Sequence, residues 1–113
     1  MKMKEIYKAN IEREYYIENI RSKLPQDVIL CQLAEELSEA AQAALKMVRV
    51  IGGKNPTIVS AETAHKELVS EIADVNACLR CVDWKDYPID ILTDEITRKI
   101  KRWSDRLDGL TDE

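Results

Sequence analysis

Two short acidic motifs hold the residues of this sequence whose types and spacing could do chemistry. EELSE places Glu36 and Glu39 three residues apart, and EIAD places Glu71 and Asp74 three residues apart. Residues at this spacing share one face of a helix, where like charges destabilise it. Two interpretations are open: each pair is solvated surface, or a positive group lies against it.

A divalent cation is the positive group that suits both pairs. Each pair lies beside an apolar stripe of its helix, so packing the two helices together would place the carboxylates in one cleft. Carboxylates that face one another raise each other's pKa unless a counter-charge is present. Magnesium prefers oxygen ligands, keeps several waters and joins carboxylates to substrate phosphates. The pattern favours a Mg²⁺ site, with Mn²⁺ as the alternative ion.

Four helical segments must position these motifs. Hydrophobic periodicity predicts helices over residues 4–23, 26–51, about 60–85 and 89–107. Pro25 ends the first segment, because the residue before a proline avoids helical backbone angles. Gly52 and Gly53 end the second, and Ser60 is placed to cap the third. We predict an all-α fold of the four-helix-bundle type, in which the second and third helices are antiparallel and their acidic pairs face each other.

Each of the last three helices carries an apolar stripe that is expected to face the core. On the second helix the stripe consists of Leu30, Leu33, Leu37, Ala41, Ala44 and Val48. On the third helix it consists of Leu68, Ile72, Val75, Leu79 and Val82. On the fourth helix it consists of Leu92, Ile96, Ile100, Trp103 and Leu107. Ala40 and Ala43 lie outside the main stripe of the second helix, and such additional apolar surface predicts a homodimer or homotetramer.

Length and composition are those of one small helical domain. The 113 residues include only three glycines and three prolines, and abundant Ala, Leu, Glu and Lys favour helices. We expect a single domain over residues 1–113. An N-terminal helix lies in residues 1–25, the motif-bearing helices lie in 26–108, and the polar tail at 109–113 is frayed.

Charge and cysteine usage narrow the partners and the compartment. A formal net charge of −4 argues against nucleic acid as the main partner. The apolar runs are far too short for a membrane span, and no signal-peptide core follows the basic N-terminus. Three irregularly spaced cysteines do not form a disulfide framework, so the cytoplasm is the expected location. Cys78 and Cys81 lie inside a long predicted helix, where packing is expected rather than redox chemistry.

The two acidic motifs also carry a resemblance to a known family. EELSE followed by EIAD is similar to the ExxE…ExxD signature of the all-α nucleoside triphosphate pyrophosphohydrolases, the MazG-like group, and the likeness covers residues 31–107. It implies an oligomeric helical bundle that hydrolyses a (deoxy)nucleoside triphosphate between the α- and β-phosphates to the monophosphate and pyrophosphate. It also implies that Mg²⁺ is held by Glu36, Glu39, Glu71 and Asp74. Glu35 and Glu36 would be the catalytic acids, with Glu35 orienting the attacking water.

Basic residues are expected to contact the phosphates of the nucleotide. Lys99 and Arg102 are three residues apart on the fourth helix and share a face. Lys46 ends the first motif-bearing stretch, and Lys54 lies in the loop that follows. Some members of the family carry a lysine about one turn before the second motif, whereas this chain has Glu67 there. The phosphate contacts are therefore less firmly implied than the metal contacts.

Two other classes of function remain open. A different enzyme of the same superfamily is one, either phosphoribosyl-ATP pyrophosphohydrolase or dimeric dUTPase. The histidine and tyrosine that usually follow the second motif in the former are missing here, where the sequence reads ADVNACL. The other class is a non-catalytic helical module that regulates or assembles partners through its apolar face.

Overall fold

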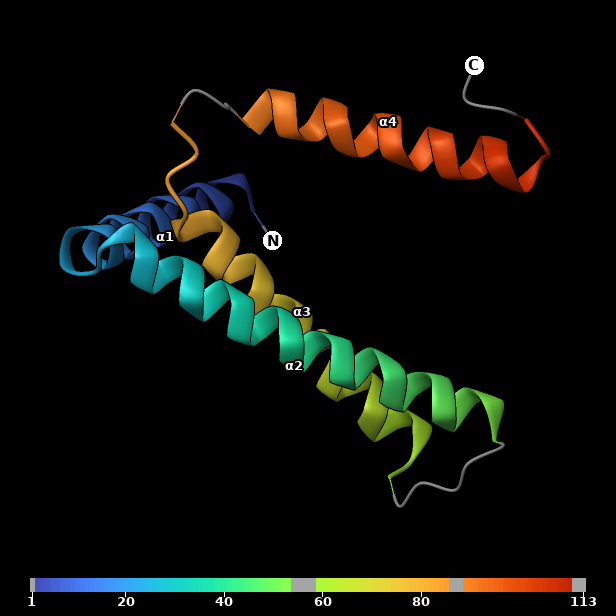
Figure 1. Cartoon of the computed structure of the whole chain (residues 1–113). Coiled ribbons are helices and arrows are strands. Elements are labelled where there is room, and N and C mark those ends of the chain that lie inside the picture. Colours follow the sequence, from blue (N-terminus) through green and yellow to red (C-terminus); the bar gives the residue numbers. More distant parts are fainter. Residues whose placement is uncertain (1, 54–58, 86–88, 111–113) are drawn as a thin grey trace. The chain divides into compact units, whose positions relative to one another are not determined.

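The computed structural model describes residues 2–53, 59–85 and 89–110. These residues form four helices and no strand (Figure 1), which confirms the predicted all-α class. The helices are α1 (Met3–Lys23), α2 (Gln26–Gly52), α3 (Ala61–Cys81) and α4 (Ile89–Leu107). Contacts between residues group the chain into two compact units. The first, Met1–Val82, contains α1, α2 and α3, and the second, Asp83–Glu113, contains α4. None of the described helices is both long enough and apolar enough to cross a membrane.

The helix ends follow from local chemistry. Pro25 is the N-cap of α2, because its fixed backbone angle suits the start of a helix. Gly53 ends α2 in a left-handed conformation with φ of 62°, and its N–H donates to the carbonyl of Arg49 at 3.0 Å. Ser60 caps α3, since its Oγ accepts a hydrogen bond of 3.2 Å from the N–H of Thr63. The predicted ends of α2 and the predicted start of α3 are confirmed to within a residue or two, whereas α3 ends at Cys81, about four residues before its predicted end.

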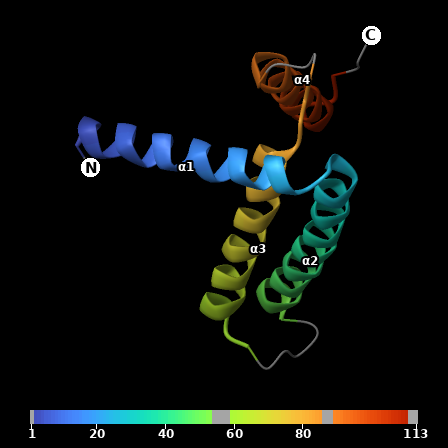
Figure 2. The same ribbon diagram turned by 90° about the vertical axis from the view of Figure 1, so that its left-hand side faces the viewer.

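Helices α2 and α3 form an antiparallel pair within the first unit (Figure 2). Three of the buried residues on these two helices are alanines, namely Ala40 and Ala43 on α2 and Ala64 on α3. Small side chains allow the two backbones to approach closely, and side chains on either side of the contact then meet across it. The predicted antiparallel arrangement is confirmed, and it brings the two acidic motifs to the same level.

Helix α1 packs across one end of this pair, as Figure 2 shows. Ile17 of α1 is buried with Ile29 of α2 and with Cys81 and Val82 at the end of α3. Arg21 of α1 donates hydrogen bonds to three backbone carbonyl oxygens at that end, those of Arg80 at 3.2 Å, Cys81 at 3.1 Å and Val82 at 2.9 Å. The guanidinium group thus caps the last carbonyls of α3, which have no partner inside the helix.

The predicted core face of α2 is wrong except at Leu33, which packs against the buried core. Leu37 and Val48 are 51% and 64% exposed, although both belong to the predicted stripe. The face that contacts α3 instead runs through Ile29, Leu33, Glu36, Ala40 and Ala43. The physical reason is that alanines at 40 and 43 permit closer packing than the larger leucines do. On α3 the prediction is better, because Leu68, Val75 and Val82 turn inward and only Ile72 is clearly exposed.

The second unit contains α4, which carries an apolar stripe along one face. Trp103 is 69% exposed, and the other members of the predicted stripe, Leu92, Ile96, Ile100 and Leu107, are exposed as well. The second unit taken alone offers these residues no core, and the prediction that they face one stays a prediction. Ion pairs along the helix, between Glu95 and Arg98 at 2.9 Å and between Lys101 and Asp105 at 2.6 Å, support α4 instead.

Candidate metal centre and adjoining pocket

Three acidic side chains converge between α2 and α3. Glu36 comes from α2, and Glu71 and Asp74 come from α3. One carboxylate oxygen from each lies within 4.8 Å of the other two. The spacing of three residues places Glu71 and Asp74 on one face of α3, and the antiparallel packing brings Glu36 opposite them. This confirms that the two motifs predicted to face each other do so.

Two oxygens of this cluster are buried without a hydrogen-bond partner. Gln32 donates from Nε2 to Oε1 of Glu36 at 2.8 Å. Oε2 of Glu36 and Oε2 of Glu71 have no partner among the residues that the structure describes. Leaving a buried polar group unpaired costs about 1–3 kcal/mol, and more when it is charged. A cation bound between the helices would satisfy both oxygens.

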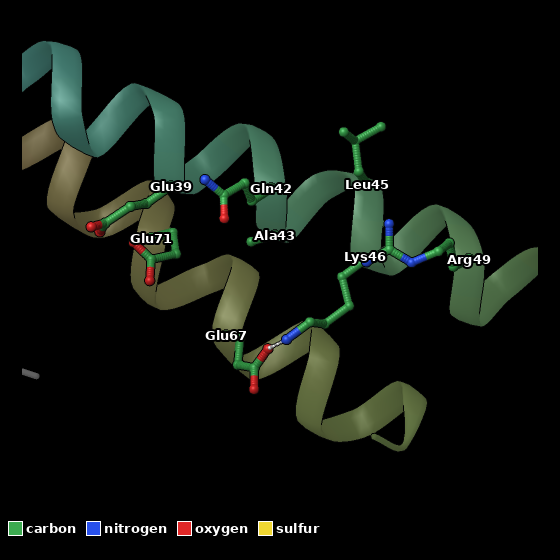
Figure 3. Close-up of a pocket in the computed structure, with 8 residues that line it drawn as sticks. All are labelled: Glu39, Gln42, Ala43, Leu45, Lys46, Arg49, Glu67 and Glu71. Carbon is green, nitrogen blue, oxygen red and sulfur yellow. Dashed lines mark hydrogen bonds and ion pairs between the residues drawn. The ribbon is translucent and has the colours of Figure 1, made fainter. Parts of the chain in front are cut away.

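Glu39 lies beside the cluster rather than within it. Its side chain projects from α2 toward Glu71 in Figure 3. The negative charge of Glu36, followed by that of Glu71, raises the pKa of the Glu39 carboxyl above its ordinary value. Of the four predicted ligands, three therefore converge directly, and the fourth adjoins them closely enough to feel their charge.

The donor set fits a hard divalent cation. All three converging groups are carboxylates, and Mg²⁺ takes oxygen ligands at about 2.0–2.1 Å in octahedral geometry, so neighbouring ligand atoms lie about 3 Å apart. One carboxylate oxygen from each of the three acids lies within 4.8 Å of those from the other two. Small rotations of these side chains would bring the oxygens to the separation of about 3 Å that a bound ion requires. Three protein ligands leave open coordination positions, which is what binding of water and phosphate requires.

A pocket of about 360 Å³ adjoins the acids along the groove between α2 and α3 (Figure 3). We call it the α2–α3 pocket, and it is lined by Glu39, Gln42, Ala43, Leu45, Lys46, Arg49, Glu67 and Glu71. Glu39 and Glu71 lie at the end of the pocket where the three acids converge. At the other end, Lys46 reaches from α2 to Glu67 on α3, with Nζ and Oε2 2.9 Å apart.

The predicted substrate residues have different outcomes. Lys46 lies in the α2–α3 pocket, at the end away from the three converging acids. Lys54 falls outside the described residues. Lys99 and Arg102 lie on α4. The hydrogen bond from Arg98 lowers the pKa of the Glu95 carboxyl on this helix, and the positive charges of Lys99 and Arg102 lower it further. Their contact with a nucleotide stays a prediction.

The two catalytic acids predicted from the sequence, Glu35 and Glu36, do not both lie in the cluster. Glu36 is one of the converging acids. Glu35 is exposed and is not a member of the cluster, since one residue along a helix turns a side chain by about 100°. Its role in orienting water stays a prediction. Arg49 and Glu67 line the pocket, although they were not predicted as site residues from the sequence. Their spacing gives a signal, because Arg49 is three residues after Lys46 and Glu67 is four before Glu71, so each pair shares a helix face.

The cysteines lie on the other side of the acidic cluster. Cys78 and Cys81 line an apolar pocket of about 230 Å³ together with Ile29 and residues at the end of α1. Burial, followed by the nearby charge of Glu36, raises the pKa of the Cys78 thiol. Both thiols are free, and Cys81 is a member of the buried core. These observations favour the packing role over redox chemistry, which needs a lowered thiol pKa.

Comparisons with protein-family profiles, with curated proteins and with solved structures find no match to this chain. Its function is therefore inferred from the residues of the site and from the order and spacing of the two acidic motifs.

Proposed function

We propose that this chain is a Mg²⁺-dependent nucleotide pyrophosphohydrolase, which cleaves a (deoxy)nucleoside triphosphate to the monophosphate and pyrophosphate. The observation that carries the proposal is the convergence of Glu36, Glu71 and Asp74 with two buried oxygens left without a hydrogen-bond partner. The resemblance of EELSE and EIAD to the motifs of the MazG-like group supports the same reaction.

The acids of the chain would hold the metal and manage the proton of the attacking water. Glu36, Glu71 and Asp74 are the proposed ligands of Mg²⁺ or Mn²⁺, and Gln32 fixes the orientation of Glu36 through its hydrogen bond of 2.8 Å. The bound ion would supply Lewis-acid polarisation of the α-phosphoryl group and lower the pKa of a water. Glu39 adjoins this position and is the nearest further carboxylate that can accept the proton.

The products follow from bond exchange at the α-phosphorus. Water forms the new bond to phosphorus, and the bond from phosphorus to the bridging oxygen of the β-phosphate breaks. Pyrophosphate leaves with that electron pair, so positive charge near it lowers the barrier. Lys46 in the α2–α3 pocket, together with the predicted contacts of Lys54, Lys99 and Arg102, would supply this charge.

Pyrophosphate release from a panel of canonical and modified nucleoside triphosphates tests the proposal. We expect Mg²⁺-dependent turnover of at least one nucleotide, and a rate reduced on the order of a hundredfold or more in Glu71→Gln and in Asp74→Asn. Glu62→Gln is the control, because Glu62 is exposed and pairs with Lys66 on the surface of α3 at 3.3 Å. Full turnover in both acidic variants would overturn the metal-site assignment.

The same panel separates the related enzymes. Exclusive hydrolysis of dUTP would place the chain with dimeric dUTPases, and exclusive hydrolysis of phosphoribosyl-ATP would place it with the histidine-pathway enzyme. The exposed apolar residues of α2, Leu37, Val48 and Ile51, favour one further candidate, a non-catalytic assembly module. Magnesium would raise the Tm of an enzyme through linkage, whereas it would leave the Tm of such a module unchanged.

We also infer a homodimer or homotetramer that works in the cytoplasm. Exposed apolar residues on α2 support association. Three free cysteines suit a reducing compartment. Nucleoside triphosphate is the proposed small-molecule partner, and neither nucleic acid nor a membrane is expected.

A further inference from the structure

The α2–α3 pocket contains an ion pair between Lys46 and Glu67, and the proposed bond cleavage gives no role to Glu67. Nζ of Lys46 lies 2.9 Å from Oε2 of Glu67, and the two side chains remain 34% and 41% exposed. The pair joins two helices across the floor of the pocket (Figure 3). The Lys46 ammonium keeps further N–H donors for an anion that enters the pocket, and the nearby Glu67 carboxylate weakens its attraction for that anion.

Arg49 is a second cation at the same end of the pocket. It lies three residues after Lys46, and its side chain extends back toward Lys46 in Figure 3. No ion pair or hydrogen bond of its guanidinium group is present within the described part of the chain. A guanidinium group binds phosphate through two parallel hydrogen bonds, so an unpaired arginine beside a lysine forms a natural contact for a phosphate group.

The charges in the pocket are separated along its length. Glu39 and Glu71 lie at the end where the three acids converge, while Lys46 and Arg49 lie at the far end, where Glu67 reaches Lys46 from α3. A ligand that follows the pocket must be able to share a divalent cation at one end and to carry negative charge at the other. A chain of linked phosphates has this character, because its oxygens bind magnesium and cationic side chains alike.

We propose that the α2–α3 pocket is the pyrophosphate subsite of this chain, in which Lys46 and Arg49 bind the β- and γ-phosphates and Glu67 is a competing carboxylate. The assignment rests on the proposed function. In the free protein Glu67 holds Lys46, and an incoming polyphosphate takes the place of the Glu67 carboxylate on Nζ. Orthophosphate is too short to reach both Lys46 and a metal ion held by the three converging acids. It therefore competes with Glu67 for Lys46 less effectively than pyrophosphate does.

Glu67 is thereby a positioning residue that sets the affinity for polyphosphate. Removing its charge leaves Lys46 unpaired and ready to bind, so the KM for the nucleotide should fall while kcat stays nearly constant. A residue that served only to hold α2 and α3 together would behave differently, because its loss would lower stability and weaken binding.

Calorimetric titration with inorganic pyrophosphate in the presence of Mg²⁺ tests the subsite without requiring turnover. We expect Lys46→Gln and Arg49→Gln each to weaken pyrophosphate binding about tenfold, which corresponds to the loss of a charge-assisted contact. Lys46→Arg should restore most of the affinity. Glu67→Gln should strengthen binding severalfold, and Glu62→Gln is its matched control because it removes the same charge from an exposed ion pair of α3.

The outcomes distinguish this inference from the proposed reaction. Unchanged pyrophosphate affinity in both cation variants, or weaker binding in a folded Glu67→Gln protein, would overturn the subsite even if nucleotides are hydrolysed. Pyrophosphate binding with the expected pattern, in a protein that hydrolyses no nucleotide, would uphold the subsite and reject the pyrophosphohydrolase. Thermal unfolding of each variant verifies that it is folded before the titration.

Discussion

At the scale of single residues, the sequence predicted the acids well and the pocket poorly. Glu36, Glu71 and Asp74 could be found because a spacing of three assigns residues to a helix face without knowledge of the tertiary structure. Glu67 could not be assigned a partner in the same way. Its contact with Lys46 spans 21 positions and exists only because α2 and α3 pack in this register. Long-range pairs of this kind depend on packing, which one sequence does not specify.

The raised pKa of Glu39 leads to a prediction about stability. A carboxyl whose pKa is raised on folding contributes stability while it is protonated, and this contribution is lost as pH rises through the ordinary glutamate pKa of about 4.3 and then through the raised value. The repulsion comes first from Glu36 and then from Glu71. Glu39→Gln removes it, so the metal-free variant should be more stable than the natural chain at pH 7, with a smaller difference near pH 4.

Thermal unfolding in the presence of EDTA between pH 4 and pH 7 measures this difference. Saturating Mg²⁺ should reverse the order of the two Tm values at neutral pH, because the natural chain gains more from the ion. Glu62→Gln serves as the control for the loss of one carboxylate on the surface. A lower Tm for Glu39→Gln at pH 7 without metal would contradict the repulsion.

At the scale of elements, the sequence predicted where helices begin and end but not which face of α2 meets α3. Pro25, Gly53 and Ser60 act locally, so their effects can be read from neighbouring residues. The face of α2 is ambiguous because apolar residues cover more than one side of it. Periodicity favoured the side with the larger residues, such as Leu37, whereas close packing selected the side with Ala40 and Ala43.

Arg21 supports the joint between α1 and the end of α3, and its replacement tests the strength of that joint. Arg21→Gln removes the guanidinium group that donates to the carbonyls of Arg80, Cys81 and Val82. We expect the free energy of unfolding in urea to fall by about 2 kcal/mol, since hydrogen bonds from charged donors contribute more than neutral ones. Arg13→Gln is the matched control, because Arg13 is an exposed arginine of the same helix. Equal free energies of unfolding of Arg21→Gln and Arg13→Gln would show that the hydrogen bonds of Arg21 do not stabilise the fold.

At the scale of the whole molecule, the buried core of one chain is small for its length. Only eight hydrophobic residues among the described part of the 113-residue chain are buried, and none of the large side chains is fully so. A chain of this size normally buries well over half of the surface that it exposes when unfolded. The exposed outer stripe of α2 is therefore hydrophobic surface that the first unit by itself leaves in water.

The outer stripe of α2 is suited to a second copy of the same chain, which leads to the last prediction. Its residues Leu37, Ala41, Ala44, Val48 and Ile51 are all exposed, and they alternate at spacings of four and three, the pattern of helices that pair along an apolar seam. Light scattering should thus give two or four times the 13.0 kDa mass of one chain. Leu37→Glu, which places a charge in the seam, should shift the mass toward that of a monomer, while Lys8→Glu at an exposed polar position of α1 should not. A natural chain that scatters as a monomer at micromolar concentration would show that the stripe has no self-association role.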